Sequence, residues 1–271
     1  MPSPERLAQV RCFLLDIDGT FYLGDRLVEG ALRFIEVLKQ QRRDFLFLTN
    51  NSSKSPRQYV EKITRLGLPI SAEKVLTSGE ATAMHLQGLR PGARIFVVGT
   101  PALEEEFRAR GFALTADSPD FAVLGFDTTL TYAKLWRLCD LVRAGVPYLA
   151  THPDFNCPTE TGYMPDIGAM IAFVTASTGH EPDSVIGKPN HLIVEKAAER
   201  TGSPISSLCM IGDRLYTDIA LGATANIPTI LVLSGETRAD EVAGSRHQPD
   251  YVFPHLGAVA DYLVQHGTAR P

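Results

Sequence analysis

Several features that would mark other classes of protein are missing from this sequence. Its four cysteines, Cys12, Cys139, Cys157 and Cys209, lie far apart and form no C-x-x-C pair, so we expect reduced, mostly buried thiols and no disulfides. The seven histidines show no zinc-ligand spacing. No apolar run approaches the roughly 20 residues that span a bilayer, and residues 1–10 lack the apolar core of a signal peptide. These absences predict a cytoplasmic protein without a membrane partner.

An excess of basic residues is also missing. The chain has 26 Lys and Arg against 31 Asp and Glu, for a formal net charge of -5, so no basic surface for nucleic acid is expected. With 44% hydrophobic and 21% charged residues, the composition is typical of a soluble globular protein. A length of 271 residues favours two domains. A homo-oligomer remains possible on these numbers.

Short apolar runs alternate with amphipathic stretches along the whole chain. This alternation is typical of βα units, so we predict an α/β protein with a mostly parallel sheet. Both ends of the chain should form one core, residues 1–88 and 184–271, around an inserted α/β domain at residues 89–183. The expected strands are Cys12–Leu15, Phe45–Leu48, Val75–Thr77, Ile95–Val98, Phe121–Leu124, Tyr148–Ala150, Leu208–Ile211 and Ile230–Leu233. The expected helices are Ala31–Gln41, Pro56 to about Gly67, Leu103–Arg110, Tyr132–Arg143, about Gly168–Thr178 and His191–Arg200.

Two carboxylates follow the first expected strand, in the run Asp16-Ile17-Asp18-Gly19-Thr20. Ligands of open α/β sheets bind at the carboxyl ends of strands. Once the strand ends and Gly19 lets the chain turn, both side chains can face one crevice. One carboxylate could then attack a substrate while the other moves protons. The alternative is an ordinary Asp-Gly turn in a solvated loop.

Polar residues stand in the same context at three further places. Thr49 to Ser52 follow the second strand, Lys188 precedes a helix, and Asp213 with Asp218 follows the strand Leu208–Ile211. Taken one at a time, each has an equally good structural explanation as a loop residue, a solvated charge or a helix cap. Together they favour one functional site.

Electrostatics indicates what this site would contain. If Asp16, Asp18 and Asp213 meet at the strand ends, each like-charge pair about 4 Å apart costs on the order of 4 kcal/mol at an effective dielectric near 20. A cation is therefore needed, and Mg²⁺ prefers such oxygen ligands while keeping positions for water and a substrate phosphate. Lys188 adds a second positive charge and the Thr49 hydroxyl adds a donor. The set predicts a phosphate site.

These residues resemble the motifs of a known family, the haloacid dehalogenase (HAD) superfamily. Within it, the chain is similar to the nitrophenyl-phosphatase and nucleotide-phosphatase branch, which carries a large α/β cap between the second and third motifs. The resemblance implies a Rossmann-like parallel-sheet core with an inserted cap. It also implies a Mg²⁺-dependent phosphomonoester hydrolase that acts on a small phosphorylated metabolite through an aspartyl-phosphate intermediate. The four motifs read Asp16-x-Asp18-Gly-Thr, Thr49-Asn50-Asn51, Gly187-Lys188-Pro189 and Gly212-Asp213-Arg214-x-x-Thr217-Asp218.

The resemblance assigns a role to each matching residue. Asp16 would be the nucleophile, and Asp18 the general acid and then the general base. The phosphoryl group would be bound by Thr49, Asn50 and Lys188, and Lys188 would also hold Asp16. Mg²⁺ would be bound by the Asp16 carboxylate, the Asp18 backbone carbonyl and Asp213, with Asp218 as outer support.

The segment from His152 to Gly168 is the part of the inserted domain that the resemblance brings to the leaving group. His152, Asp154 and Asp166 are its candidate substrate contacts. His152 is equally well explained as a partly buried structural histidine, and Asp166 better as the N-cap of the following helix. One departure from the family lies elsewhere, since Tyr216 stands where relatives often carry Asp.

A different class of protein could use some of the same residues. A phospho-accepting signalling domain, or a phosphate-binding protein without turnover, also gathers acidic residues, Thr and Lys around Mg²⁺. The signalling domain would not need the large insertion or Asp18 as a proton donor, and the binding protein is disfavoured because every motif position is filled. A hydrolase is therefore the leading hypothesis and these are its alternatives.

Overall fold

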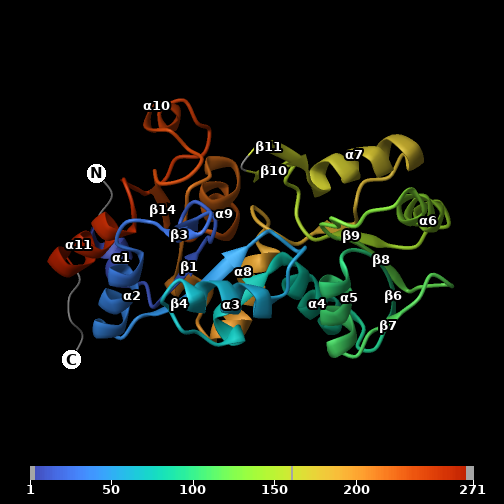
Figure 1. Ribbon diagram of the computed structural model, residues 1–271, viewed down its shortest axis with the longest axis horizontal. Helices are drawn as coiled ribbons and strands as arrows, with labels where there is room; N and C mark the ends of the chain where they lie inside the picture. Colours follow the sequence, from blue (N-terminus) through green and yellow to red (C-terminus); the bar gives the residue numbers. More distant parts are fainter. Residues whose placement is uncertain (1–3, 160, 267–271) are drawn as a thin grey trace. The chain divides into compact units, whose positions relative to one another are not determined.

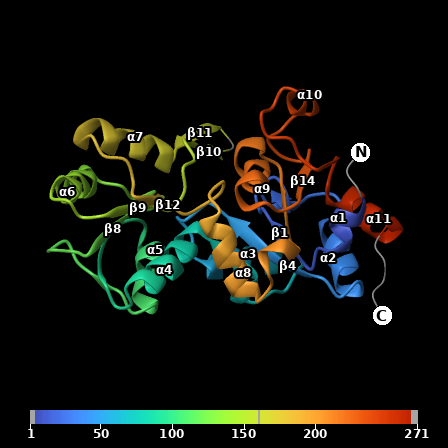
Figure 2. The ribbon, with the colours of Figure 1, turned by 180° about the vertical axis from the view of Figure 1, so that it is seen from behind.

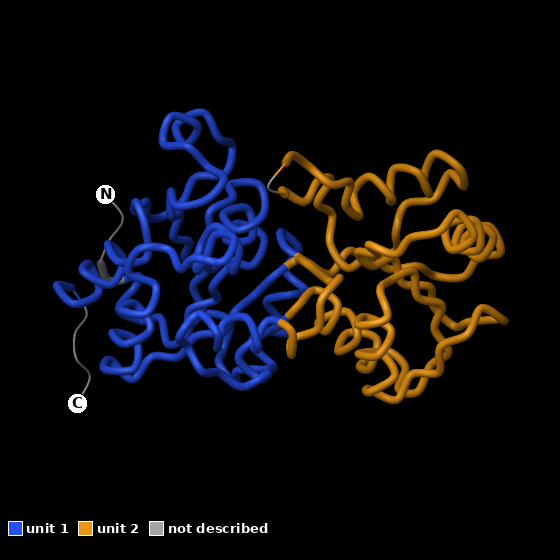
Figure 3. The backbone as a smooth tube through the Cα atoms, viewed as in Figure 1, with its two compact units in different colours: residues 1–49, 59–76, 188–271 blue, residues 50–58, 77–187 orange. Residues whose placement is uncertain are grey.

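The chain forms two compact units. The computed structural model describes residues 4–159 and 161–266. Unit 1 comprises residues 1–49, 59–76 and 188–271, and unit 2 comprises residues 50–58 and 77–187 (Figure 3). This division differs from the predicted domain limits at residues 50–58, 77–88 and 184–187, and the predicted domains themselves stay a prediction.

Unit 1 is built on a six-stranded sheet in the order β15-β14-β13-β1-β4-β5. The central strand β1 pairs in parallel with both β4 and β13, and β13, β14 and β15 continue in parallel. The parallel core predicted from the alternation is thereby confirmed. The strands are β1 (Cys12–Leu15), β4 (Asp44–Thr49), β5 (Val75–Thr77), β13 (Leu208–Gly212), β14 (Thr229–Val232) and β15 (Tyr251–Phe253).

The central position of β1 follows from its composition. Its four residues, Cys12 to Leu15, are all fully buried, as expected for a parallel strand covered on both faces. Phe13 and Leu15 enter a core with residues of α2 and α11, and these two helices lie side by side (Figure 1). The remaining elements of this unit are α1 (Pro4–Ala8), the hairpin β2 (Tyr22–Leu23) and β3 (Arg26–Leu27), α2 (Ala31–Gln40), α8 (Leu192–Thr201), α9 (Ala220–Ala225), α10 (Ala239–Val242) and α11 (Leu256–His266), with short helical turns at Ala72–Lys74, Ile205–Ser207 and Leu215–Ile219. Helix α3 (Pro56–Arg65) starts in unit 2 and ends in unit 1.

Unit 2 has its own parallel sheet, in the order β12-β9-β8-β6-β7. Helices α6 and α7 cover one face of this sheet and α4 and α5 the other (Figures 1 and 2). A separate antiparallel hairpin, β10 with β11, precedes α7. The strands are β6 (Arg94–Val98), β7 (Ala113–Leu114), β8 (Phe121–Leu124), β9 (Tyr148–Ala150), β10 (Asn156–Thr159), β11 (Gly162–Pro165) and β12 (Ser184–Val185), and the helices are α4 (Ser78–Leu89), α5 (Pro101–Ala109), α6 (Tyr132–Arg143) and α7 (Ile167–Thr178).

Helix α4 is absent from the sequence-based prediction, for a physical reason. Seven of its twelve residues are buried, and they are spread around the helix rather than along one stripe. Without an apolar stripe the helical period leaves no signal in the sequence. The capping residue was the available clue, because the Thr77 side chain accepts a hydrogen bond from the Glu80 backbone N–H at 3.0 Å.

The hairpin β10–β11, the strand β15 and the helix α11 are also additions to the prediction. Both strands of the hairpin are largely exposed, so they lack the apolar run that identified the buried strands.

No helix in the described part of the chain combines the length and the apolar character needed to cross a bilayer.

The side-chain carboxylate of Glu106 lies between helices α4 and α5, which cover the same face of the unit 2 sheet. Both oxygens of Glu106, on α5, are buried, and no described residue donates a hydrogen bond to them. Its Oε2 lies 3.2 Å from the place where a Cβ on Gly79 of α4 would stand. Burial, together with the charge of Glu80, raises the pKa of Glu106 to about 8, although Arg110 opposes the shift.

This carboxylate makes the stability of the protein depend on pH. Because the folded state holds the Glu106 proton between pH 4.5 and about 8 while the unfolded state loses it, the free energy of unfolding falls as pH rises through that window. Glu106→Gln should therefore raise the free energy of unfolding at pH 8 by about 2–4 kcal/mol and flatten its pH dependence, as measured by urea denaturation from pH 5 to 8. The exposed neighbour Glu105 provides the control Glu105→Gln, which should change neither. Parallel pH profiles for wild type and Glu106→Gln would contradict the expectation.

Candidate active site

The two carboxylates of the first motif, Asp16 and Asp18, differ in burial at the end of β1. The Asp16 backbone N–H donates to the Ile211 carbonyl of β13 at 2.9 Å, so the sheet register extends to this residue, and its side chain is nearly buried. Asp18 lies two residues further on and is exposed. Gly19 turns the chain with a φ of +85°, as expected for glycine in the left-handed region.

Asp213 follows β13, the strand next to β1. One of its carboxylate oxygens accepts a hydrogen bond from the Glu236 backbone N–H at 2.7 Å, and the other from the buried Thr20 hydroxyl at 3.3 Å. Asp218 lies one turn later and is fully buried. It accepts a hydrogen bond from the Arg214 backbone N–H at 3.1 Å.

Three of these carboxylates meet in one place. Asp16, Asp213 and Asp218 each offer an oxygen within 4.8 Å of the others. The neighbouring strands β4 and β13 flank β1, so parallel pairing brings residues that are remote in sequence to one edge of the sheet. The convergence at the strand ends, on which the sequence argument depends, is therefore observed for Asp16 and Asp213.

Lys188 supplies the positive charge inside this group. It is 2% exposed, and its Nζ forms ion pairs with Asp16 and, at 2.7 Å, with Asp218. The same Nζ donates to the Leu48 carbonyl of β4 at 3.2 Å. Burial alone would lower the pKa of Lys188, but the adjacent charges of Asp16 and Asp218 outweigh it and raise the pKa. The lysine therefore stays charged.

One lysine does not neutralise three buried carboxylates. Burial, followed by the charges of Asp16 and Asp218, raises the pKa of Asp213 to about 8. Burial and Asp16 likewise raise the pKa of Asp218, to about 6, against the opposing effect of Lys188. At both groups burial and the neighbouring carboxylates disfavour the charged form, although the positive charge of Arg214 opposes the shift.

The other two core candidates stand at the end of β4. Thr49 is its last residue and is 5% exposed. Asn50 follows in unit 2, where its side chain donates to an Asp154 carboxylate oxygen at 3.2 Å. Its amide oxygen lies close to Gly187, since a Cβ there would approach it to 2.6 Å. Asn50, itself an expected phosphate ligand, thus lies against Gly187, which directly precedes Lys188 in the chain.

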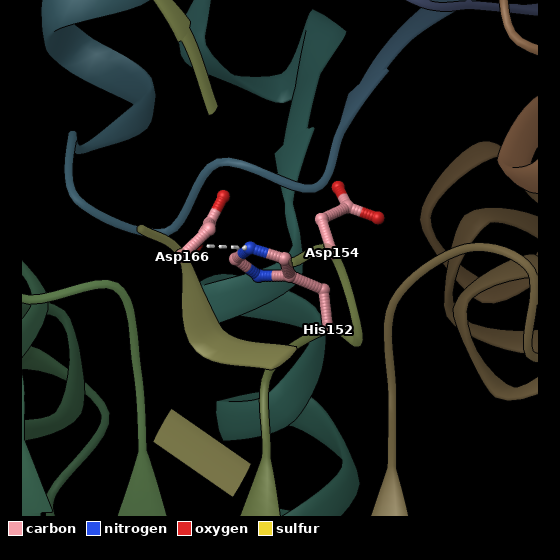
Figure 4. A group of neighbouring side chains, drawn as sticks. All are labelled: His152, Asp154 and Asp166. Atoms are coloured by element: carbon pink, nitrogen blue, oxygen red, sulfur yellow. Dashed lines mark hydrogen bonds and ion pairs between the residues drawn. The ribbon is translucent and has the colours of Figure 1, made fainter. Parts of the chain in front are cut away.

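The three candidates of the inserted segment lie together in unit 2. His152, Asp154 and Asp166 are all buried and offer ligand atoms within 4.8 Å of one another. Figure 4 shows the Asp166 carboxylate facing the imidazole of His152, with Asp154 on the other side of the ring. The His152 Nε2 and the Asp166 carboxylate are 3.0 Å apart.

Hydrogen bonds account for both nitrogens of this histidine. Its Nδ1 lies 3.1 Å from the Thr151 hydroxyl and 3.4 Å from the Ser78 hydroxyl. Ser78 in turn donates to the Asn50 carbonyl, and Asp166 accepts from the Ile167 backbone N–H as the N-cap of α7. This arrangement fits the structural explanation given for His152 and Asp166. Their contact with substrate stays a prediction.

Comparison with known proteins decides the family. Residues 13–113 match a family model described as haloacid dehalogenase-like hydrolase, and residues 185–259 match a second model of HAD-like hydrolases. The chain is 36% identical to an acid sugar phosphatase of Staphylococcus saprophyticus, over 93% of this chain and 98% of that protein. It is 33% identical to the 5'-nucleotidase YutF of Bacillus subtilis, again over 93% and 98%.

The chain belongs to the haloacid dehalogenase-like hydrolases. The solved structure of a 4-nitrophenylphosphatase from Thermotoga maritima superimposes on it with a TM-score of 0.92 at 46% identity, covering 94% of this chain and 98% of that one. The resemblance to the nitrophenyl-phosphatase branch is thereby confirmed, and the protein is a HAD-type phosphatase.

The structure adds residues to this phosphatase site that the motifs did not include. The loop after β14 makes two contacts with the site. The Glu236 backbone N–H donates a hydrogen bond to Asp213, and the Ser234 hydroxyl donates one to the Gly19 carbonyl at 2.7 Å. The signal was present in the sequence: Ser234-Gly235-Glu236 follows an expected strand as the other motifs do.

Removal of the buried side chain of Lys188 should lower the free energy of unfolding of the phosphatase. Lys188→Met leaves the carboxylates of Asp16 and Asp218 without their cation, so the free energy of unfolding at pH 8 without divalent metal should fall by about 3–5 kcal/mol. Lys196→Met removes a lysine of α8 whose partner Glu199 is exposed, and should cost less than about 1 kcal/mol. Chemical denaturation measures the free energy of unfolding of both variants. Equal losses of this free energy would show that the charge of Lys188 stabilises the fold no more than that of Lys196.

Proposed function

We propose that this HAD-type phosphatase is a Mg²⁺-dependent phosphomonoester hydrolase that acts on a small phosphorylated metabolite through an aspartyl-phosphate intermediate. The observation that carries the proposal is the gathering of Asp16, Asp213 and Asp218 at the strand ends, where Lys188 pairs with Asp16 and Asp218. A nucleophilic carboxylate, further carboxylates and a buried ammonium are what transfer of a phosphoryl group to an aspartate requires.

In the first step the Asp16 carboxylate attacks the phosphorus of the ester. The bond between phosphorus and the ester oxygen breaks, and Asp18 gives its proton to the leaving alkoxide. In the second step Asp18, now a carboxylate, takes a proton from water as the water attacks the phosphorus. Inorganic phosphate leaves, Asp16 is free again, and Asp18 is protonated as at the start. The exposure of Asp18 suits a group that must exchange protons with water.

The residues at this site fit a divalent cation. Three carboxylate oxygens within 4.8 Å form a hard donor set of the kind that Mg²⁺ prefers. The raised pKa values of Asp213 and Asp218 indicate negative charge that a cation would offset. Asp16, Asp213 and the Asp18 backbone carbonyl would hold the ion, with Asp218 supporting them. Bound there, Mg²⁺ supplies positive charge to the transferring phosphoryl oxygens.

Thr49, Asn50 and Lys188 are the proposed ligands of the phosphoryl group. The Lys188 Nζ already contacts Asp16, so it can also attract an anion that approaches this carboxylate. Residues 89–183 are proposed to act as the cap, with His152, Asp154 and Asp166 as the substrate side. A cytoplasmic location is part of the proposal, which leaves the oligomeric state open.

The identity of the leaving group in the substrate has to be determined by experiment. The relatives carry the names of a 5'-nucleotidase, an acid sugar phosphatase and a 4-nitrophenylphosphatase. This variety at 33–46% identity supports a small soluble phosphate ester without favouring one leaving group. Sugar phosphates, nucleotides, glycerol phosphate and pyridoxal phosphate are therefore the compounds to test.

The decisive experiment measures phosphate release from that panel with Mg²⁺ and with excess chelator. Wild type should hydrolyse at least one ester only when the metal is present. Asp16→Asn should lower kcat on the order of a thousandfold or more, as loss of a nucleophile does in other enzymes, with a normal thermal unfolding curve. Asp25→Asn, which changes an exposed carboxylate of the following hairpin, should leave kcat unchanged.

Three outcomes would count against the proposal. Undiminished rates in chelator would show that hydrolysis does not need the metal. Near-normal activity of Asp16→Asn would show that Asp16 is not the nucleophile. A phosphoprotein that persists after the ester is consumed would favour the signalling alternative over turnover.

A backbone feature gives an independent test of the metal site. Asp213 lies so close to Gly235 that a Cβ there would stand 1.9 Å from its Oδ2. Gly235→Ala should therefore displace the carboxylate and raise the Mg²⁺ concentration for half-maximal activity at least about tenfold, the loss typical when metal ligands are disturbed. Gly244→Ala, where the nearest atom is 3.9 Å away, is the matched control. An unchanged metal requirement in Gly235→Ala would mean that Asp213 is not a ligand.

A further inference from the structure

The loop at residues 234–237, which follows β14, binds Asp213 through its backbone. The Glu236 N–H donates a hydrogen bond to the Asp213 carboxylate at 2.7 Å, and the Thr237 N–H donates one to the Asp213 backbone carbonyl at 3.2 Å. The loop and Asp213 both belong to unit 1. Because Asp213 is 2% exposed, the loop helps to fix the position of a buried carboxylate.

The side chain of Glu236 has two partners, and both come from the motif that contains Asp213. The Tyr216 hydroxyl donates a hydrogen bond to its Oε1 at 2.9 Å, and the Arg214 Nε forms an ion pair with its Oε2 at 2.9 Å. Tyr216 is the residue at which the motif departs from its family, and an ionised aspartate in its place could not donate to Glu236. Glu236 thus contacts Asp213 through its backbone and two neighbouring residues through its carboxylate.

These contacts lead from the protein surface to the buried carboxylate. Tyr216 is 50% exposed, and the side chains of Glu236 and Arg214 are partly exposed. A glutamate loses side-chain entropy when it is held in one rotamer, and an ion pair between exposed side chains contributes little by itself. A separate partner on each carboxylate oxygen therefore fixes Glu236 more firmly than the ion pair alone.

We propose that Glu236 is a positioning residue for the metal site. Tyr216 and Arg214 hold its side chain, and the 234–237 loop then keeps the Asp213 carboxylate in the position in which it would bind the cation. The inference rests on the proposed function and adds Glu236 and its two partners to the site. Residues that bind a metal ligand determine how well that ligand is placed. Loss of this support should therefore weaken Mg²⁺ binding.

The charge of these residues also affects a cation, and the test must separate charge from position. Arg214 directly follows Asp213 in the chain, so its positive charge lies close to the proposed metal site and would repel Mg²⁺. If Arg214 acts only through its charge, Arg214→Met should strengthen Mg²⁺ binding. If Arg214 holds Glu236, the same variant should weaken it, which is the result that we expect.

The experiment measures Mg²⁺ binding by isothermal titration calorimetry in the absence of substrate. Tyr216→Phe removes a hydroxyl and no charge, and should raise the dissociation constant of Mg²⁺ about threefold, the effect of one hydrogen bond. Glu236→Ala removes both side-chain contacts and should raise it about tenfold. The number of binding sites should stay that of wild type, because partial unfolding would lower the number of sites and not their affinity. The Mg²⁺ concentration for half-maximal hydrolysis of 4-nitrophenyl phosphate should rise in the same order.

A double-mutant cycle tests whether Tyr216 acts through Glu236. In the Glu236→Ala background, Tyr216→Phe should have no further effect on the Mg²⁺ dissociation constant. Two control variants should bind Mg²⁺ as wild type does. Asp240→Asn removes a negative charge from an exposed side chain nearby in the sequence, and Tyr163→Phe removes the hydroxyl of an exposed tyrosine in unit 2.

Three results would overturn the inference while wild type binds Mg²⁺ and hydrolyses the ester. They are an unchanged Mg²⁺ dissociation constant in Glu236→Ala, an equal effect of Tyr216→Phe with and without the Glu236 side chain, and tighter Mg²⁺ binding in Arg214→Met. A wild type that binds no Mg²⁺ and hydrolyses the ester equally well in chelator would instead reject the metal requirement of the proposed function.

Discussion

The site depends on one interaction, the contact of the buried Lys188 ammonium with the carboxylates of Asp16 and Asp218. With Asp213 included, four charged groups occupy a place that is almost closed to water, and their formal sum is negative. A third contact, to the Leu48 carbonyl, also holds the lysine in place. In the proposed function, this remaining negative charge attracts the divalent cation, and the cation in turn attracts the phosphate.

Small residues allow the carboxylates to come so close. A Cβ on Gly212 would stand 2.2 Å from the Asp218 carboxylate, and one on Gly19 would stand 2.4 Å from that of Asp213. Gly19 also needs its positive φ for the turn after β1. The glycines of the motifs are therefore spaces for neighbouring acidic side chains as well as turns. A motif written only in terms of its carboxylates leaves out what permits them to converge.

Unit 2 holds a second buried cluster of polar side chains. His152, Asp154 and Asp166 meet the distance requirement for a metal site, and one atom of each also forms a hydrogen bond, with Thr151, Asn50 and the start of α7 respectively. A buried histidine with partners on both nitrogens fixes the chain around it. The network reaches the Asn50 carbonyl through Ser78, so it orders the residue that directly follows Thr49.

The sequence alone was sufficient to place Asp16, Thr49 and Asp213 at the ends of parallel strands, since apolar runs such as Cys12–Leu15 reveal buried strands and the following polar residues must then share an edge. Only the tertiary structure decided that Lys188 contacts Asp16 from 172 positions away and that Gly235 lies against the Asp213 carboxylate. Helix α4 escaped detection because it is buried on many sides and has no apolar stripe. Local patterns record which surface a residue presents to the core. They do not record which distant residue lies on the other side of it, because that choice is made by strand order and by the packing of the whole sheet.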